Sequence, residues 1–364
     1  MIFSGAYKGR KVLVTGHSGF KGSWLCQWLM RLGADVTGIS LFVPSTPSNF
    51  ELLGLERRVR HHTANITHLD QLTDIFAASR PAIVFHLAAQ SLVRRAYEEP
   101  KLTFDTNTGG TVNVLEAIRR TSSVEAAVLI TSDKCYENVE WEFGYRETDR
   151  LGGKDPYSAS KAAAEVAFSA YARSFFAGSG APRLATTRAG NVIGGGDWAQ
   201  DRVVPDCVRA WSKGEPALIR NPSSTRPWQH VLEPLSGYLC LGARLLEGHA
   251  DFSGSSFNFG PAAEVNHSVG ALIEEMRKTW PDGAWRAERQ EAAPQEARLL
   301  KLNCDRALHL LGWRATLSFE QSVEMTASWY LHHHRGGADM AAYADGQLDS
   351  YERLARELGR TWAT

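Results

Sequence analysis

Three glycines close to the amino terminus constrain the fold of this chain more than any other feature. Gly16, Gly19 and Gly22 follow a short β-prone run at 11–15 and precede a stretch at 24–32 whose apolar residues recur at helical spacing. Such glycines form a tight turn, let a pyrophosphate approach the backbone and allow the helix to pack closely on the strand. The spacing G-x-x-G-x-x-G in this position therefore predicts an α/β unit that binds a dinucleotide.

The next β-prone run, 35–41, is expected to end with an acidic residue if it holds the adenosine ribose of NAD. No Asp or Glu stands at that end and no Arg follows directly, so Ser40 is the nearest polar candidate and the run does not separate NAD from NADP. We place Asn65 and Ile66 beside the adenine, where Asn65 can form a hydrogen bond. The dinucleotide contacts predicted in this part of the chain are Gly16, His17, Gly19, Phe20, Lys21, Gly22, Ser40, Asn65 and Ile66.

Small residues follow a third β-prone run at 83–86. The backbone of Leu87, Ala88 and Ala89 is predicted to lie against the nicotinamide ribose, although a strand that ends in a small-residue turn explains the pattern as well. Asn107 begins a helix a short distance downstream. A buried asparagine at such a point either supports a local distortion or a water chain near a catalytic group, or is a packing group with satisfied hydrogen bonds.

Two further segments carry the chemistry. Tyr157 and Lys161 are one helical turn apart and share a helix face, so the lysine can stabilise a tyrosinate that accepts a proton while the substrate carbon loses a hydride. The apolar run at 126–130 predicts a buried strand, and Ser132–Lys134 follows at its carboxyl end, where open α/β sheets bind their ligands. A simple alcohol dehydrogenase does not need this extra acid and lysine. An enzyme that oxidises, eliminates and then reduces does.

Together, the glycine triplet, the His86–Ala89 segment, Asn107 and the Tyr157-x-x-x-Lys161 pair resemble the extended short-chain dehydrogenase/reductase superfamily. Within it, the chain is most similar to the CDP-glucose 4,6-dehydratase family. The segments that carry this resemblance are 19–25, 131–136, 188–198 and 226–234, so it covers most of the chain. In dTDP-glucose dehydratases the position after the catalytic Asp is a Glu, whereas Lys134 here agrees with the CDP-glucose family.

The resemblance implies an α/β fold: a Rossmann-type, doubly wound parallel sheet with a smaller α/β carboxyl-terminal substrate domain. It implies that residues 1–188 bind NAD, with a returning segment near 229–252, and that 189–364 mainly bind the nucleotide sugar. Extended enzymes of this kind pair through two helices per subunit, so a homodimer or homotetramer is expected. The apolar helix after Tyr157 is one candidate surface, and core packing explains its composition equally well.

The resemblance also implies a role for each catalytic residue during conversion of CDP-glucose. Tyr157 takes the proton from the glucose 4-hydroxyl as the hydride leaves carbon 4, Ser132 hydrogen-bonds the same oxygen, and Lys161 lowers the pKa of Tyr157 and orients the ribose. The new ketone acidifies carbon 5, and Asp133, in its protonated form, is the acid for the hydroxyl that departs from carbon 6. Return of the hydride to carbon 6 regenerates NAD.

The role of Lys134 stays open at this point. An ordinary lysine, with a pKa near 10.4, is neutral in only about one molecule in ~2,500 at pH 7, so a carbon 5 base needs desolvation or a nearby cation such as Lys161. In the competing hypothesis Lys134 stays charged and stabilises the enolate while another group moves the proton. A surface lysine after a strand is the third interpretation.

The second half of the chain is expected to hold the diphosphate of the nucleotide sugar. Two negative phosphates need fixed cations, and arginine offers bidentate geometry. Arg202 and Arg226 are the leading candidates, and Asn191, in a glycine-rich segment, is expected to bind the phosphate or the sugar. The full set of predicted substrate contacts is Asn191, Arg202, Arg220, Arg226 and Arg298.

Composition excludes several other classes. The chain has 40 basic and 40 acidic residues and a formal net charge of zero, which gives no electrostatic footprint for nucleic acid or membrane surfaces. No apolar segment approaches the roughly 18 residues that a membrane helix requires. The five cysteines form no C-x-x-C pair and no metal-ligand spacing, so we expect no metal site and a reduced, cytoplasmic environment.

Two rival functions follow from the same motifs. A 4-epimerase or another sugar-nucleotide dehydratase shares the scaffold, but an epimerase needs no acid and lysine for elimination, so Asp133 and Lys134 argue against it. A non-catalytic dinucleotide sensor keeps the glycines and has no need of Tyr157 and Lys161, which this chain retains. Replacement of Tyr157 by Phe separates an enzyme from a sensor.

Overall fold

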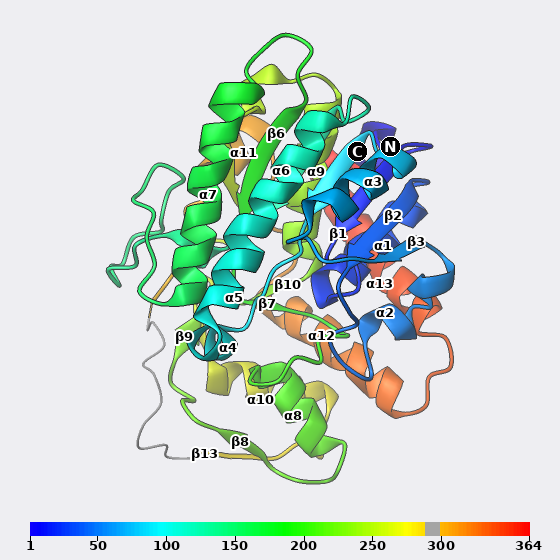
Figure 1. Ribbon diagram of the computed structural model, residues 1–364. Helices are drawn as coiled ribbons and strands as arrows, with labels where there is room; N and C mark the ends of the chain where they lie inside the picture. The colour runs from blue at the N-terminus through cyan, green and yellow to red at the C-terminus, as the bar shows by residue number, and fades with distance from the viewer. Residues whose placement is uncertain (288–298) are drawn as a thin grey trace.

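The computed structural model describes residues 1–287 and 299–364 and is built around one parallel sheet (Figure 1). Its seven strands follow the order β11-β6-β5-β4-β1-β2-β3 and are parallel throughout. The order reverses between β1 and β4, which creates the topological switch point where such sheets bind ligands. The predicted doubly wound Rossmann-type sheet is therefore confirmed. The strands are β1 (Lys11–Thr15), β2 (Asp35–Ser40), β3 (Arg60–Thr63), β4 (Ile83–His86), β5 (Ala126–Ile130), β6 (Arg183–Arg188) and β11 (Ser256–Asn258).

Helices cover both faces of the sheet, and each face has its own hydrophobic core. On β1, Val12 and Val14 belong to the core that includes residues of α1 and α9, whereas Leu13 belongs to the core that includes residues of α3, α6 and α7. This alternation follows from the two-residue period of a strand, and burial on both faces explains the nearly continuous apolar runs. The covering helices are α1 (Phe20–Arg31), α3 (Leu69–Ser79), α6 (Gly110–Arg120), α7 (Pro156–Phe175) and α9 (Leu232–Leu246).

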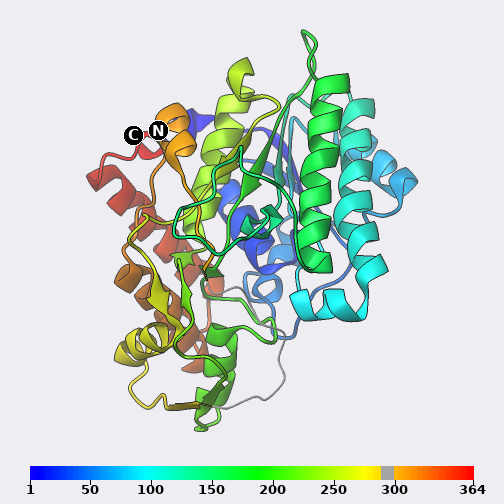
Figure 2. The same cartoon turned by 90° about the vertical axis from the view of Figure 1, so that its left-hand side faces the viewer.

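A smaller part, built mainly from the carboxyl-terminal half, lies below the sheet in Figures 1 and 2. Among the described residues its strands form three two-stranded ladders, β7 with β10, β8 with β13, and β9 with β12. These strands are β7 (Val192–Ile193), β8 (Ala217–Ile219), β9 (Thr225–Arg226), β10 (Gln229–His230), β12 (His267–Ser268) and β13 (Trp285–Ala287). The remaining α-helices of the described chain are α2 (Asn49–Leu52), α4 (Val93–Glu98), α5 (Pro100–Phe104), α8 (Val203–Trp211), α10 (Val269–Thr279), α11 (Asp305–Leu311), α12 (Phe319–His334) and α13 (Met340–Glu357).

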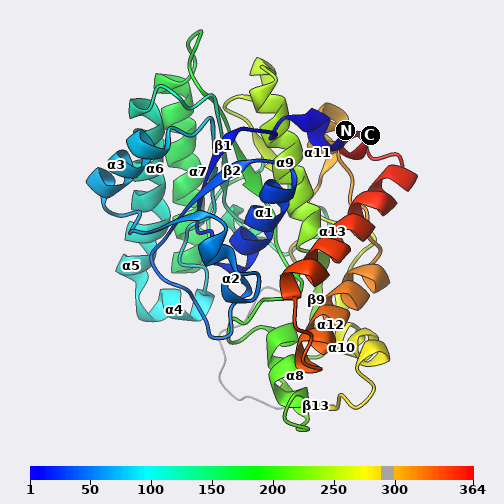
Figure 3. The ribbon, with the colours of Figure 1, turned by 90° about the vertical axis from the view of Figure 1, so that its right-hand side faces the viewer.

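The chain crosses between the two parts more than once. Helix α9 packs on β5 and β6, and β11 then joins the edge of the sheet beside β6. The segment that returns to the sheet therefore extends to Asn258. Helix α13 lies along α1 (Figure 3), where Trp28 Nε1 donates to Glu352 Oε1 at 2.8 Å. The division at residue 188 stays a prediction. No helix of the described chain has the length and apolar character needed to cross a membrane.

Candidate active site

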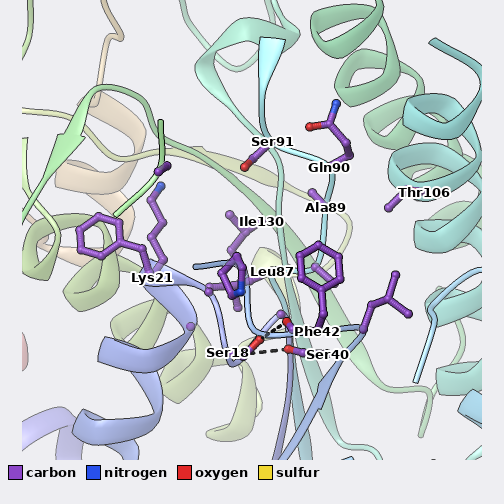
Figure 4. Close-up of a pocket in the computed structure, with 18 of the residues that line it drawn as sticks. Ser18, Lys21, Ser40, Phe42, Leu87, Ala89, Gln90, Ser91, Thr106 and Ile130 are labelled. Atoms are coloured by element: carbon purple, nitrogen blue, oxygen red, sulfur yellow. Dashed lines mark hydrogen bonds between the residues drawn. The ribbon is translucent and has the colours of Figure 1, made fainter. Parts of the chain in front are cut away.

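A cavity of about 400 Å³ opens at the carboxyl ends of the strands (Figure 4). The glycine loop, the end of β2, the segment after β4 and the amino-terminal turn of α7 surround it. In Figure 4, Lys21 lies on one side of the cavity and Gln90 and Thr106 on the other, with Leu87 and Ile130 between them. The structure brings these predicted residues together as cavity lining: Gly16, Gly19, Phe20, Lys21, Gly22, Ser40, Asn65, Ile66, Leu87, Ala88, Ala89, Ser132, Tyr157, Lys161 and Arg202.

The glycine loop leaves no room for side chains. Gly16 has φ +75°, and a Cβ placed there would lie 2.7 Å from the backbone nitrogen of Ala88. A Cβ at Gly22 would lie 2.1 Å from the carbonyl oxygen of Gly16. The loop backbone is therefore bare toward the cavity and packed against the end of β4. This cradle at the start of α1 fits a dinucleotide diphosphate.

His17 lies behind this loop. It is fully buried, its Nδ1 is 2.9 Å from Ser40 Oγ, and its Nε2 is 2.7 Å from His61 Nδ1. Burial lowers the pKa of His17 to about 4, so the ring is neutral. Within the described chain, His17 is absent from the cavity lining. It contacts the cavity only indirectly, through its hydrogen bond with Ser40.

The end of β2 forms the adenosine side of the cavity without a carboxylate. Ser18 donates its backbone N–H to Ser40 Oγ at 3.1 Å and its hydroxyl to the carbonyl oxygen of Phe42 at 2.8 Å (Figure 4). The cavity lining that follows Ser40 is Leu41, Phe42, Pro44 and Ser45. This side of the described cavity therefore carries neither an acid for a ribose 2′-hydroxyl nor a cation for a 2′-phosphate.

Asn107 acts one step away from the cavity. It sits in a π-helical turn, Asp105–Gly109, and its Oδ1 accepts from the backbone N–H of Gln90 at 2.8 Å. Its Nδ2 donates to the carbonyl of Gln90 at 3.0 Å and to Ser160 Oγ at 2.9 Å. Asn107 therefore ties the segment after Ala89 to helix α7 from a π-helical turn with its side-chain hydrogen bonds satisfied, which fits both the local distortion and the packing group.

Helix α7 presents the Tyr–Lys pair from its first turns. Asp155 caps the helix, with Oδ1 accepting from the backbone N–H of Ser158 at 3.0 Å. Burial raises the pKa of Tyr157 to about 12, while a hydrogen bond with Ser132 and the charge of Arg202 act in the opposite direction. Lys161 Nζ donates to the carbonyl of Ile130 at 3.3 Å. Burial lowers the pKa of Lys161 to about 8, and the Glu165 carboxylate opposes this shift.

The segment after β5 places Asp133 beside Ser132, and within the described chain Asp133 is absent from the lining of the main cavity. Ser132 Oγ accepts from the backbone N–H of Lys134 at 3.2 Å and donates to Asp133 Oδ1 at 3.0 Å. Asp133 is only 4% exposed and lies against Gly190, where an added Cβ would fall 1.8 Å from Oδ2. A second, small cavity of about 10 Å³ is lined by Asp133 together with Gly190 and Gln229. Lys134 is partly exposed and lines neither described cavity, so its role stays a prediction.

The predicted arginines separate in the structure. Arg202 lines the main cavity and pairs with Asp197, with Nη1 2.7 Å from Oδ2. Arg220 instead pairs with Asp201 at the surface at 2.9 Å, and Asp201 also pairs with Arg94. Arg226 lies in β9, and its Nη1 donates to the carbonyl of Thr225 at 2.8 Å. Asn191 adopts φ +50° between β6 and β7, and Arg298 lies outside the described residues.

Several cavity residues were missed by the sequence reasoning. Lys21 was predicted as a cofactor contact. Burial and the charge of Arg202 lower its pKa to about 8, and this shift could not be predicted because both effects depend on the fold. Gln90 directly follows the Ala88–Ala89 pair, so the small-residue turn was the available signal. Asp197 lies in the glycine-rich segment 188–198, in which only Asn191 was predicted as a contact. The polar lining residues outside the predicted set include Ser18, Ser45, Gln90, Ser91, Thr106, Thr131 and Asp197.

Comparisons with known proteins agree with this geometry. Residues 13–326 match the family described as GDP-mannose 4,6 dehydratase. The CDP-glucose 4,6-dehydratase of Salmonella typhimurium is 44% identical over 355 residues, which are 96% of this chain and 98% of that protein. The dTDP-glucose 4,6-dehydratase of Neisseria meningitidis serogroup B is 27% identical over 88% of this chain and 93% of its own length. The UDP-glucose 4-epimerase of Thermus thermophilus, solved as a complex with NAD, superimposes with a TM-score of 0.74 at 25% identity and covers 90% of this chain and 99% of its own.

Proposed function

Because this chain belongs to the family described as GDP-mannose 4,6 dehydratase, we propose that it is an NAD-dependent CDP-glucose 4,6-dehydratase. The resemblance predicted from the motifs is confirmed by the identity to the Salmonella enzyme, which extends over nearly the whole of both chains. The proposed reaction converts CDP-D-glucose to CDP-4-keto-6-deoxy-D-glucose and water. Both the epimerase and the dTDP-glucose dehydratase are more distant relatives.

One observation carries the proposal. Ser132 lines the cavity together with Tyr157 and Lys161 and donates to Asp133 Oδ1 at 3.0 Å, so one hydroxyl links the cavity that holds the proton acceptor proposed for oxidation to the acid proposed for elimination. Carbon 4, which is oxidised, and carbon 6, which is reduced, belong to the same hexose. Groups that act on both carbons must therefore reach the sugar in one binding position. A 4-epimerase has no need of the buried acid.

NAD, when bound, accepts a hydride from carbon 4 and returns it to carbon 6. The bare backbone of the glycine loop would hold its diphosphate, and Ala88 and Ala89 would lie along the nicotinamide ribose. Tyr157 accepts the 4-hydroxyl proton; burial raises its pKa to about 12, and Ser132 and the charge of Arg202 act in the opposite direction, toward the tyrosinate that this step requires. Lys161, held by the carbonyl of Ile130, adds positive charge in the same cavity.

Elimination then depends on the residues after β5. Asp133 gives a proton to the hydroxyl that leaves carbon 6, and its burial keeps bulk water away from the enone. Lys134 either removes the carbon 5 proton as a neutral amine or stays charged and stabilises the enolate. Arg202 is the candidate for the substrate diphosphate among the residues that line the cavity, and Asn191, Arg220, Arg226 and Arg298 remain predicted contacts.

The experiment that tests the proposal is incubation with CDP-glucose and NAD in deuterated water, followed by mass spectrometry and NMR of the product. The expected product is a 4-keto-6-deoxy sugar nucleotide with solvent deuterium at carbon 5. Turnover of dTDP-, GDP- or UDP-sugars with recovery of unlabelled CDP-glucose would keep the scaffold and reject the substrate. Dinucleotide binding without turnover of any of them would favour the sensor.

Three further assignments belong to the same proposal. A homo-oligomer is supported by Val166 and Phe175, which are 59% and 53% exposed on helix α7. A reducing, cytoplasmic setting is supported by the five cysteines, all of which are free thiols. We also assign NAD binding to 1–188 with the returning segment and nucleotide-sugar binding mainly to 189–364, in an enzyme that supplies deoxysugars for cell-surface polysaccharide.

A further inference from the structure

A buried ion pair lies behind the catalytic group. Arg188, the last residue of β6, contacts Glu165 on α7 through two nitrogens on one edge of its guanidinium: Nη2 is 2.8 Å from Oε2 and Nε is 3.0 Å from Oε1. The two side chains are only 3% and 2% exposed. Burying two charges is costly unless their remaining hydrogen-bonding capacity is also used, so the surroundings of the pair show what it holds together.

Hydroxyl groups from three elements converge on the Glu165 carboxylate. Thr131 Oγ1 donates to Oε1, and Thr186 Oγ1 and Ser256 Oγ donate to Oε2 at 2.9 Å and 3.2 Å. Burial raises the pKa of Glu165, but the charge of Arg188 and these hydrogen bonds outweigh it and lower the pKa below its ordinary value. Glu165 is therefore an anion that fastens β5, β6 and β11 to helix α7.

Arg188 extends the network to the segment beyond Asp133. Its Nη1 donates to Tyr136 Oη at 2.8 Å and to the carbonyl of Glu147 at 3.1 Å, and its guanidinium lies 4.9 Å from the centre of the Tyr136 ring. The pair thus holds the chain on both sides of the catalytic acid: Thr131 precedes Ser132, and Tyr136 closes the turn that contains Asp133.

The same pair sets the charge balance around Lys161. Glu165 is one helical turn after Lys161 on α7, and its carboxylate favours the charged lysine against the effect of burial. The other titratable groups that act on or lie near Lys161 are Tyr157 on α7, Asp133 and Cys135 after β5, His86 at the end of β4, and Lys21 on α1. His86 is neutral, because burial lowers its pKa to about 3, and Lys21 is a competing cation.

We infer that Glu165, locked by Arg188, is a positioning residue that supplies the counter-charge of Lys161 and holds the Thr131–Asp133 segment against the Tyr157–Lys161 helix. The inference rests on the proposed function for its consequence in turnover, and on the one-turn spacing of Lys161 and Glu165 along α7 for its effect on Lys161. Glu165 acts through other residues, and the proposed catalytic residues remain Ser132, Asp133, Lys134, Tyr157 and Lys161.

The test uses the intact chain with Glu165→Gln and a matched control, Glu233→Gln. Glu233 is also a buried carboxylate, but its partners are the backbone of Thr316 and Leu317 and the hydroxyl of Tyr351. The first readout is the rate at which acetic anhydride acetylates Lys161, followed by peptide mass spectrometry from about pH 6 to about pH 10, because only the neutral amine reacts. Glu165→Gln removes the carboxylate that favours the charged form of Lys161, so the labelling midpoint is expected about one pH unit lower, with about tenfold faster labelling on the acidic side. Glu233→Gln is expected to match the wild type.

The second readout is the pH profile of CDP-glucose turnover. Its alkaline limb is expected to move down with the labelling midpoint in Glu165→Gln, since a charged Lys161 supports the tyrosinate. Thr131→Val removes a hydroxyl that contacts Glu165 Oε1 and the carbonyl of Thr187, and it removes no charge, so it is expected to lower turnover without moving the midpoint. This variant separates the positioning of the Thr131–Asp133 segment from the counter-charge.

A folded Glu165→Gln variant with the wild-type labelling midpoint would overturn the inference. Where Glu165→Gln alone does not fold, the double variant Glu165→Gln/Arg188→Met removes both charges together, and an unchanged midpoint there overturns it equally. Labelling of Lys161 requires no turnover, so a chain that rejects CDP-glucose but shows the shifted midpoint would contradict the proposed function and leave the inference standing.

Discussion

Substitution of Gly190 tests the role of Asp133 most directly. A Cβ at Gly190 would lie 1.8 Å from Asp133 Oδ2, whereas ordinary contact begins near 3.4 Å, so the carboxyl group has to retreat by the difference, about 1.6 Å. The side chain is buried and anchored by Ser132, so this movement breaks the 3.0 Å hydrogen bond to Oδ1. A displacement of about 1 Å can cost roughly a hundredfold in rate, and the crowding itself costs about 1–3 kcal/mol of stability.

Gly190→Ala is therefore expected to lower dehydration about a hundredfold while leaving oxidation at carbon 4 largely intact, because Tyr157 is not displaced. In a single turnover the reduced dinucleotide then accumulates, which its absorbance reports after rapid mixing of enzyme, NAD and CDP-glucose. Gly260→Ala is the control, because its Cβ would meet its nearest neighbour, Cys304 Sγ, at an ordinary 3.5 Å. A folded Gly190→Ala variant that dehydrates at the wild-type rate, or that loses oxidation and elimination to the same extent, would refute the assignment of Asp133 as the acid.

Three other predictions follow from the site and its surroundings. Tyr157→Phe is expected to lower turnover about a thousandfold with unchanged dinucleotide affinity by calorimetry, and a loss of affinity without loss of turnover would contradict it. Arg202→Gln removes a cation from the cavity and is expected to weaken CDP-glucose binding at least about tenfold. The double variant Arg202→Gln/Asp197→Asn leaves no unpaired carboxylate, so it is expected to bind CDP-glucose as weakly but to have a higher Tm than the single variant. Burial raises the pKa of Glu233 to about 7, so the folded protein holds this proton more tightly than the unfolded chain. The free energy of unfolding is therefore expected to fall by up to about 3 kcal/mol as the pH rises from about 4.5 to about 7. Urea unfolding of Glu233→Gln is expected to lack this slope, and equal slopes in both proteins would reject the shifted pKa.

Local patterns were sufficient for the nucleotide-binding unit. The glycine loop, β1 and α1 form one continuous stretch, and the apolar runs that became β4 and β5 are each followed directly by the residues that line the cavity. The carboxyl ends of parallel strands meet at one edge, so residues that follow several such runs can be grouped without knowing the full topology. The Tyr157–Lys161 pair needed only the helical period.

The other parts of the fold and of the site depend on contacts between residues far apart in the sequence, which local patterns do not show. Strand β11 has three residues and is recognisable only by its position beside β6, because so short a run carries no periodicity. Glu165 and Arg188 are 23 residues apart, and their contact arises from the way α7 packs across β5 and β6. Arg220 was grouped with the substrate contacts by residue type, yet its partner is Asp201 at the surface. Residue type alone does not distinguish an arginine that faces a phosphate from one that holds a loop.

On the proposed roles, elimination is expected to depend on the second half of the chain more than oxidation does. Tyr157, Lys161 and the glycine loop all belong to the first half, and a dehydrogenase needs little more. Asp133 instead rests on the strand that leads into the second half: its backbone N–H donates to the carbonyl of Ala189 at 3.4 Å, and its carboxyl group lies against Gly190. Gln229, from β10, donates to the carbonyl of Gly190 at 3.0 Å and so holds this wall in place. Asp133 is therefore held by the segment that leads from β6 into the second half of the chain. On this geometry, changes in the second half that loosen Gly190 are expected to impair elimination before they impair oxidation.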